Sequence, residues 1–303
     1  IDTFILPSKY YNTFDKIFNE NTTSDDVYKE VILPHITSTI VFYGQTNTGK
    51  TYTSSFIIKK LLFSGSNVSI KAMEIYNNEC YDLLTNRNKV SALQHCVRIH
   101  IRENKDGHKV FNCIKSTKIV KNNGYNKYSS RSHIIYEITV NGTVYIIVDL
   151  AGMELVVNNE SHFINLSLYA LRECIQRLGA KKNPPYRNSK LTYCLKDYLS
   201  KNLICVCTIS SMKQHELNNL RTMEYGISMK HVRNIRASSL ESNMMKYNTH
   251  TLRVGQLETK VINEFLKTKE RTLLKLLHDL LQHRLELTKE ILGILTTTNN
   301  DVR

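Results

Sequence analysis

One octapeptide constrains this chain more than any other feature of its sequence. Residues 44–51 read Gly-Gln-Thr-Asn-Thr-Gly-Lys-Thr, a complete GxxxxGK(S/T) pattern. The β-branched and aromatic run 39–43 predicts a strand before it, and residues 52–62 follow with helical periodicity. A loop between a strand and a helix is where this pattern binds phosphate. We therefore predict a phosphate-binding loop that comprises Gly44, Gln45, Thr46, Asn47, Thr48, Gly49, Lys50 and Thr51.

The residue types in this loop suit a nucleotide bound together with Mg²⁺. Backbone N–H groups and the amino end of the following helix can surround the phosphates. Lys50 can neutralise the β- and γ-phosphate oxygens, and the Thr51 hydroxyl can coordinate the metal ion. The predicted ligands are therefore a nucleoside triphosphate and Mg²⁺.

Two later segments have the composition of γ-phosphate sensors. Residues 126–133 form a dense polar run, with several hydroxyls and one guanidinium, ahead of a predicted strand. Residues 149–154 begin with Asp149 at the carboxyl end of the apolar run 144–148, and Gly152 follows. In phosphate-binding-loop proteins an Asp at such a place serves Mg²⁺. Each segment alone is equally consistent with a capped turn. Together with the phosphate-binding loop, the two segments indicate two switches that sense the γ-phosphate.

The chain shows two regimes of secondary-structure pattern. Up to about residue 235, short β-branched or aromatic runs alternate with helix-like stretches, which predicts an α/β domain with a central sheet. The predicted strands are 69–76, 97–101, 134–140, 143–149 and 203–209, and the predicted helices are 51–63, 164–178, 190–199 and 217–231. Residues 236–249, rich in Ser and Asn, predict a linker.

Residues 250–303 predict a helical extension. Its apolar residues recur at coiled-coil spacing over 273–294, although Arg284 occupies one position of the seam. The regular part is short. A homodimer through 273–294 and a helix that packs back on the preceding domain are both consistent with this pattern.

Composition and charge narrow the class of partner. The 303 residues contain no run near the roughly 18 consecutive apolar residues of a membrane-spanning helix, so we expect no membrane partner. Seven cysteines without a CxxC pair predict reduced thiols in a cytosolic or nuclear protein. Because residues 236–303 carry 11 basic and 8 acidic side chains, +11 of the net charge of +14 falls on residues 1–235. That charge favours an acidic partner. Nucleic acid is disfavoured, since no nucleic-acid-binding module is recognisable.

Together, the motifs resemble the kinesin motor domain. Residues 43–53, YGQTNTGKTYT, look like the kinesin phosphate-binding loop, which adds Tyr52 to the nucleotide-binding residues. Residues 126–133 match the switch I motif NxxSSRSH, and residues 149–154 match the switch II motif DLAGSE with Met153 in place of Ser. Further similarity at 14–18 (an early strand), 74–84, 164–168, 185–192 and 222–234 extends over most of residues 10–235. The last of these segments is similar to the bipolar spindle subfamily.

This resemblance implies a fold and a division into domains. The fold is α/β, a P-loop NTPase of kinesin type, in which a central, mostly parallel β-sheet is flanked by helices and followed by the C-terminal helical extension. The motor domain would occupy residues 1–235, before the linker 236–249 and the extension 250–303.

The resemblance also assigns roles around ATP and Mg²⁺. Thr51 and Ser130 would bind the metal ion directly, and Asp149 would contact these ligands and not the ion itself. Ser129 would position the attacking water, and the Gly152 N–H would sense the γ-phosphate. An ion pair between Arg131 and Glu154 would close the two switches, and Glu154 would relay the water's proton. The catalytic residues implied in this way are Lys50, Ser129, Ser130, Arg131, Gly152 and Glu154.

The partner implied by the resemblance is the microtubule. In kinesins the tubulin-facing surface is built by the helix that begins with INxSL and by the PYRxSKLT loop and helix, here 164–178 and 185–199. The expected location is the cytoplasm and cytoskeleton, with the spindle and nucleus as further sites. The basic residues that would face acidic tubulin are Arg172, Arg177, Lys181, Lys182, Arg187 and Lys190.

Departures from the family pattern leave two functions open. An RxRP counterpart is missing, residues 54–71 and 155–163 are short, and 110–125 is too short for the whole helix expected before switch I. An ATP-driven microtubule motor, with microtubule-stimulated ATPase activity, is favoured by the retained nucleotide residues. A degenerate, non-motile microtubule-binding protein that binds nucleotide without productive turnover is favoured by the short segments and by Met153.

Overall fold

The computed structural model describes residues 6–11, 13–35, 38–64, 67–118, 131–152, 159–200 and 203–229, together with Gln282. The chain divides into two units, one of Ile1–Tyr28 with Thr37–Asn234 and the other of Lys29–Ile36 with Ile235–Arg303. The sheet and helices below belong to the first unit, and the π-helical turn Tyr28–Ile32 leads into the second. The predicted linker, and the coiled-coil segment apart from Gln282, lie outside the described residues. The domain boundaries and the homodimer therefore stay predictions.

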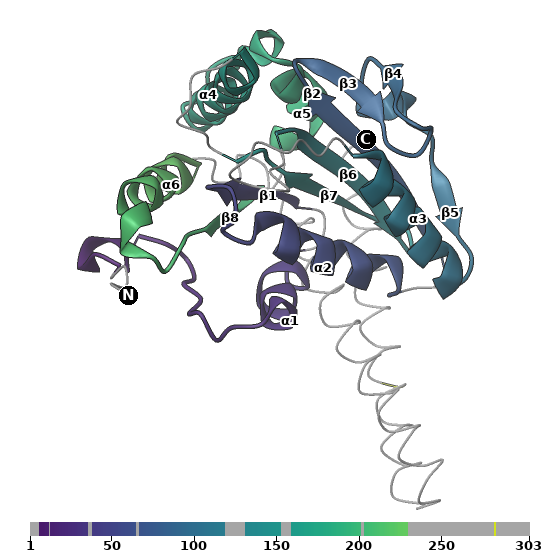
Figure 1. Ribbon diagram of the computed structural model, residues 1–303, viewed down its shortest axis with the longest axis horizontal. Coiled ribbons are helices and arrows are strands. Elements are labelled where there is room, and N and C mark those ends of the chain that lie inside the picture. Colours follow the sequence, from purple (N-terminus) through teal and green to yellow (C-terminus); the bar gives the residue numbers. More distant parts are fainter. Residues whose placement is uncertain are drawn as a thin grey trace, which may run out of the picture. The chain divides into compact units, whose positions relative to one another are not determined.

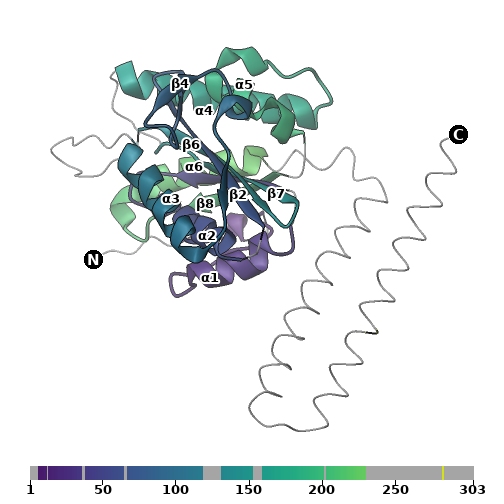
Figure 2. The same ribbon diagram turned by 90° about the vertical axis from the view of Figure 1, so that its right-hand side faces the viewer.

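In the part of the first unit that the structure describes, a mixed sheet of eight strands forms the centre (Figures 1 and 2). The strand order is β4-β3-β2-β6-β7-β1-β8, and β5 pairs with β2. The strands are β1 Thr39–Gly44, β2 Val68–Tyr76, β3 Glu79–Asp82, β4 Asn88–Val90, β5 Ile99–Ile101, β6 His133–Val140, β7 Thr143–Asp149 and β8 Leu203–Thr208.

The α/β class, with a central sheet flanked by helices, is confirmed, but the expectation that the sheet is mostly parallel is wrong. Strand β1 pairs in parallel with β7 and β8, whereas the other five pairings are antiparallel. The reason lies in two short turns. Asn141 and Gly142 join β6 to β7 with φ of 50° and 85°, and Asn77 and Asn78 join β2 to β3 with φ of 47° and 60°. Two-residue turns with positive φ connect antiparallel neighbours.

Helices cover both faces of the sheet (Figure 1). Helices α1 Ser24–Val27, α2 Lys50–Leu62 and α3 Asn104–Thr117 lie on one face, and α4 Asn159–Gly179, α5 Lys190–Leu199 and α6 Glu216–Met229 lie on the other. Side chains alternate along each strand. In β1, Val41 and Tyr43 therefore join the buried core beneath α4, α5 and α6, and Ile40 and Phe42 are buried on the α2 face.

One expectation about local structure is confirmed and another is wrong. Residues 110–125 do not contain the whole helix before the switch I motif, because that helix, α3 of 14 residues, begins earlier, at Asn104. A capping box between Glu103 and Asp106 fixes that start. Residues 14–18 form no strand; the Phe14 ring instead packs over Gly226 of α6, where an added Cβ would lie 3.2 Å from it.

Strand β8 is only half-buried, and it lies at the end of the described strand order. All seven cysteines are free thiols. Among the described residues, no helix is both long and apolar enough to span a bilayer.

Candidate nucleotide site

Sheet topology brings the three motif segments to one edge. Strands β1 and β7 are parallel neighbours, with Phe42 in register with Asp149, so their carboxyl ends meet. Strand β6 runs the other way, and its first residues lie at the same edge, with Ile134 opposite Asp149. The loop after β1, the segment after β7 and the segment before β6 are therefore adjacent, as the motifs predict.

The phosphate-binding loop folds against β8. An added Cβ at Gly44 would lie 2.2 Å from the Thr208 carbonyl oxygen, so the close approach requires glycine. The Thr48 hydroxyl donates to the Gln45 carbonyl at 2.7 Å and lies 2.7 Å from the Thr208 hydroxyl. These contacts fix the loop between the two parallel strands.

Lys50 is the buried cation of the loop. Its Nζ lies 2.8 Å from both the Gly44 and the Gln45 carbonyl oxygens, and only 6% of the residue is exposed. Helix α2 begins at Lys50 after Gly49, whose φ of 101° is unfavourable for other residues. Gly49 has no side chain that could cap the helix, and the amino end of an α-helix favours an anion.

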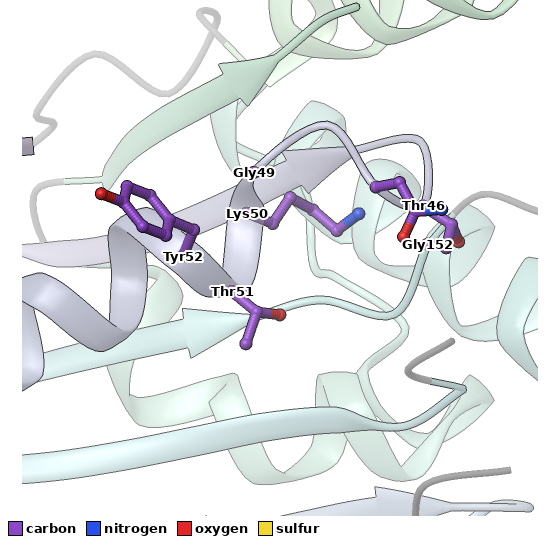
Figure 3. Close-up of a pocket in the computed structure, with 7 residues that line it drawn as sticks. Thr46, Gly49, Lys50, Thr51, Tyr52 and Gly152 are labelled. Carbon is purple, nitrogen blue, oxygen red and sulfur yellow. The ribbon is translucent and has the colours of Figure 1, made fainter. Parts of the chain in front are cut away.

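A pocket of about 280 Å³ opens over this loop. In Figure 3 the Lys50 side chain extends toward Thr46 and Gly152, whereas Tyr52 points away from them. Tyr52 is 76% exposed. The pocket is lined by Thr46, Asn47, Gly49, Lys50, Thr51, Tyr52 and Gly152.

Thr51 and Asp149 have the chemistry of a magnesium site. The Thr51 hydroxyl donates to Asp149 Oδ2 at 2.8 Å. Asp149 is 3% exposed, and its other oxygen, Oδ1, is buried with no hydrogen-bond partner among the described residues. A buried carboxylate oxygen without a donor beside a hydroxyl suits a hard, oxygen-seeking cation. These residues therefore fit Mg²⁺.

Lys118, at the end of α3, also reaches this carboxylate. Its Nζ lies 3.9 Å from Asp149 Oδ2, and its side chain is 11% exposed. The sequence reading missed Lys118, which belongs to no motif and is 31 residues away from Asp149 in the chain.

Gly152 lies directly against the phosphate-binding loop. An added Cβ would lie 2.1 Å from Thr46 Oγ1 and 3.0 Å from the Thr46 backbone nitrogen. Since backbone atoms cannot rotate away as a side chain can, any larger residue would push the segment after β7 off the loop. The predicted sensor of the γ-phosphate is thus close to the loop that binds it.

Buried polar contacts hold the segment before β6. The Ser132 hydroxyl donates to Glu74 Oε1 at 2.6 Å, and Glu74, fully buried in β2, forms an ion pair with Arg87. His133 accepts from the Ala151 N–H at 3.0 Å and lies 2.7 Å from the Ser167 hydroxyl. Burial lowers the pKa of His133 to about 3, so its ring is neutral near pH 7.

The sequence reading did not find these contacts. One signal was present, because Glu74 interrupts an apolar run in a predicted strand, and a buried carboxylate needs a partner. Nothing local identified Arg87, Ser132 or Ser167 as that partner or as part of the same network.

Some predicted residues are not tested. Arg131 is described and buried at the edge of the sheet. Ser129, Ser130 and Glu154 lie outside the described residues, so their roles and the ion pair between Arg131 and Glu154 stay predictions.

The predicted tubulin-facing residues gather on α4, the loop after it and the start of α5. Arg172, Lys181, Lys182 and Arg187 are exposed, and Lys190 is half-buried. Arg177 is also exposed but pairs with Glu173 of the same helix at 2.9 Å, which partly neutralises it. The exposed surface of α4 also carries Phe163, Leu166 and Tyr169, an apolar contribution that the charge argument missed.

The class of P-loop nucleotide-binding proteins is defined by a strand, a phosphate-binding loop and a helix in succession. A parallel neighbouring strand ends in an Asp, as β7 does here at Asp149. Within that class, the sequence pattern of the kinesin motor domain matches residues 7–232, and the chain belongs to the kinesin family.

Similarity to individual kinesins supports membership of this family. Kinesin-like protein bimC of Emericella nidulans is 29% identical over 86% of this chain and 27% of its own length. The kinesin heavy chain of Caenorhabditis elegans is 29% identical over 77% of this chain and 36% of its own. Drosophila NOD, in complex with AMPPNP, superposes with a TM-score of 0.60 at 25% identity, covering 73% of this chain and 85% of that one. The chain thus spans well under half the length of these two curated relatives.

Proposed function

We propose that the chain is an ATP-hydrolysing motor domain that works on microtubules. The observation that carries the proposal is the meeting of Lys50, Thr51, Asp149 and Gly152 at one edge of the sheet, around an open pocket. Two structures of one relative support the choice of ligand: Drosophila NOD was solved with AMPPNP and with ADP and divalent manganese.

In this proposal, hydrolysis is catalysed by position and charge rather than by covalent chemistry. Lys50 exchanges its two loop carbonyls for phosphate oxygens, and the amino end of α2 donates N–H groups to them. Thr51 and Ser130, with Asp149 behind them, would hold Mg²⁺, which would supply further charge neutralisation. The Gly152 N–H donates to the γ-phosphate. The exposed ring of Tyr52 provides an apolar surface beside the pocket for the base.

The remaining catalytic roles lie on the two switches. Ser129 positions the attacking water, and Glu154 relays the proton that this water loses. Arg131 pairs with Glu154 and so joins switch I to switch II over the nucleotide. The proposed chemistry therefore needs residues of switch I, Ser129 and Arg131, together with Glu154 of switch II.

The proposed partner is the microtubule, bound through α4 and α5. The exposed basic residues of these helices complement an acidic protein surface. In a structure of Drosophila NOD, that protein and bovine tubulin were docked into a map of the NOD–microtubule complex. A cytoplasmic, cytoskeletal location follows from this partner, and the spindle stays a prediction.

ATP turnover with and without microtubules tests the proposal. Microtubules should stimulate turnover by the wild-type chain, and Lys50→Ala should lower turnover by roughly 10²- to 10³-fold, the usual loss when one preorganised charge stabiliser is removed. Lys59→Ala, an exposed lysine of the same helix, is the matched control and should leave turnover unchanged.

Three other outcomes would change the proposed function. Microtubule co-sedimentation without stimulated turnover would establish the non-motile nucleotide-binding alternative. Stimulated turnover without microtubule gliding would separate an ATPase from a motor. Turnover that is indifferent to microtubules, with no co-sedimentation, would remove the microtubule as partner.

A further inference from the structure

Two buried thiols from distant parts of the sequence touch beneath the start of α5. Cys80 lies in β3 and Cys194 in α5, 114 positions further along the chain, and their Sγ atoms are 3.8 Å apart. Cys80 is fully buried and Cys194 is 6% exposed. Both are free thiols, and in the part of the chain that the structure describes no group of three His, Cys, Asp or Glu side chains could hold a metal ion. The contact is therefore one between two reduced thiols.

A hydrogen bond fixes the two segments beside each other. The Lys190 N–H, at the start of α5, donates to Asn78 Oδ1 in the turn between β2 and β3 at 2.9 Å. Cys80 follows Asn78 by two residues, and Cys194 follows Lys190 by four, about one helical turn. The two thiols thus meet one turn inside this contact. Since β3 is paired on both sides, with β2 and β4, the start of α5 is the less constrained partner.

The surroundings give the two thiols different reactivity. The hydrogen bond from the Cys194 thiol lowers the pKa of Cys80, and the Lys190 ammonium lowers it further, although burial opposes both. The same hydrogen bond, together with burial, raises the pKa of Cys194. Because the thiolate is the nucleophilic form, Cys80 is the thiol that attacks an oxidant, and Cys194 is placed to react with the product.

We propose that Cys80 and Cys194 are a modification site at which hydrogen peroxide forms a disulfide that ties the start of α5 to β3. The Cys80 thiolate attacks one peroxide oxygen, the O–O bond breaks, and a sulfenic acid forms with release of hydroxide. The Cys194 sulfur then attacks the Cys80 sulfur, loses its proton and displaces the oxygen as water. In total the two thiols lose two hydrogens, and the peroxide is reduced to two molecules of water.

A second pair of thiols in the same chain provides a comparison. The Sγ atoms of Cys205 and Cys207 are 3.7 Å apart, but both residues lie in β8 with one residue between them. Two residues of an extended strand span about 6.4 to 6.8 Å, the upper end of the Cα separations that disulfides accept. Both residues are also held in register with β1, opposite Val41 and Tyr43. This pair should therefore stay reduced, because closing it would pull β8 away from β1.

The disulfide has a consequence for the surface beside it. Bonded sulfur atoms are about 2.0 Å apart, so the present contact must shorten and the start of α5 must move toward β3. Arg187 and Lys190, two of the proposed tubulin-facing residues, lie at this end of α5. We expect the oxidised chain to bind microtubules at least about fivefold more weakly than the reduced chain. This consequence rests on the proposed function, whereas the disulfide itself does not.

The test is peptide mapping of the full wild-type chain after treatment with hydrogen peroxide. Remaining thiols are blocked with N-ethylmaleimide in denaturant, and the digest is analysed by mass spectrometry without reduction. We expect a linked pair of peptides containing Cys80 and Cys194, lighter by two hydrogens than their sum and separated by dithiothreitol. Cys205 and Cys207 should carry N-ethylmaleimide. Because the mapping uses the wild-type chain, it does not depend on how any variant folds.

Two variants and the melting temperature check the assignment. Cys194→Ala removes the second thiol, so no linked pair should form, and dimedone should trap the sulfenic acid at Cys80. Cys207→Ala removes one thiol of the other close pair and should leave the linked pair unchanged. Oxidation should raise the melting temperature of the wild type and of Cys207→Ala by roughly 5 to 10 °C, and that of Cys194→Ala not at all.

The outcomes separate this site from the motor proposal. Absence of the linked pair under conditions that oxidise the exposed Cys113, or equally fast closure of Cys205 with Cys207, would overturn the proposed site. A linked chain that binds microtubules as tightly as the reduced chain would overturn the effect on the α5 surface. A reduced chain that binds no microtubules would overturn the proposed function, while the linked peptides and the rise in melting temperature would still support the disulfide.

Discussion

The two halves of the nucleotide site are built in different ways. The phosphate-binding half consists of consecutive residues, and its shape comes from the backbone: Gly44 passes close to Thr208, and Gly49 has a positive φ before α2. The switch half is assembled from distant segments by buried side chains, with Glu74 holding Ser132 and His133 linking Ala151 to Ser167. The first half is a fixed cradle, whereas the second depends on polar contacts that can be exchanged.

This difference has a physical consequence. A buried hydrogen bond contributes only about 1 kcal/mol net but costs more when one partner is left unpaired. Such contacts therefore define discrete arrangements without adding much stability to any of them. A segment that must respond to the γ-phosphate benefits from this property, and a loop that must hold three phosphates does not.

The largest expected effect on stability is at Glu74. In Glu74→Gln the amide group would oppose Arg87 or Ser132 with a donor, and the buried ion pair would be lost. We expect the free energy of unfolding to fall by about 3 kcal/mol, as for other buried pairs that lose one charge. Urea denaturation monitored by circular dichroism measures this change.

The same hairpin provides the control. Glu79 pairs with Lys89 at 3.1 Å, but both side chains are largely exposed. Glu79→Gln should cost less than about 1 kcal/mol. Equal losses in the two variants would mean that the switch half gains nothing special from its buried carboxylate.

The contrast between the halves also explains what the sequence could predict. The loop of Gly44 to Thr51 was readable because one local string contains all of its contacts, and the strand–loop–helix context is confirmed. Strand β7 and helix α5 were predicted with their observed bounds, since each is an uninterrupted apolar or amphipathic run between turn residues.

The failures have equally specific causes. The sheet was expected to be mostly parallel because helices and strands alternate, yet the Asn141-Gly142 turn shows that β6 and β7 form a hairpin. The partners of Asp149, Glu74 and His133 could not be predicted, because Lys118, Arg87 and Ser167 are distant in sequence and follow no periodic pattern.

Gly152 lies where the phosphate-binding half and the switch half meet, against Thr46. Gly152→Ala would place a methyl group against the Thr46 backbone and displace the segment after β7. We expect turnover to fall by about 10²-fold, since a displacement near 1 Å at a catalytic group has that effect. ADP binding, which needs no γ-phosphate sensor, should change much less. Steady-state kinetics and ADP titration measure the two effects.

The control glycine is Gly142, at the far end of β7. Its φ of 85° disfavours other residues, but an added Cβ would meet no atom within 4 Å. Gly142→Ala should therefore cost about 1 kcal/mol of stability through backbone strain and leave turnover intact. If Gly152→Ala were as active as this control, close approach to Thr46 would not matter for catalysis.

His133 makes the stability of the switch half depend on pH. Burial lowers its pKa in the folded chain to about 3 from an ordinary value of 6.5, so between these values only the unfolded chain binds the proton. The resulting stability is complete above about pH 6.5 and is lost as the pH falls. Relative to His133→Gln, the wild-type chain should lose about 2 kcal/mol between pH 7 and pH 5.

Denaturant titrations at pH 5, 6 and 7 give this slope directly. His100→Gln, which changes an exposed histidine of β5, should leave the wild-type slope in place. A slope for His133→Gln that matches the wild type would show that the buried ring is not the source of the pH dependence.

The smallest effect concerns Lys118, because its Nζ is 3.9 Å from Asp149 and so adds charge without a short hydrogen bond. Lys118→Met keeps the apolar stem but removes a cation close to the carboxylate, which should cost about 1 kcal/mol in the nucleotide-free chain. When Mg·ADP is bound, the metal ion provides positive charge at the same carboxylate, so the cost should shrink. The melting temperature of Lys118→Met should therefore rise more on adding Mg·ADP than that of the wild type.

The control is Lys105→Met, which changes a lysine of α3 and breaks its exposed pair with Glu103, the residue before the helix; it should show the wild-type shift. Identical shifts in Lys118→Met and wild type would mean that Lys118 and the metal ion do not share Asp149, and that α3 has no part in the switch half.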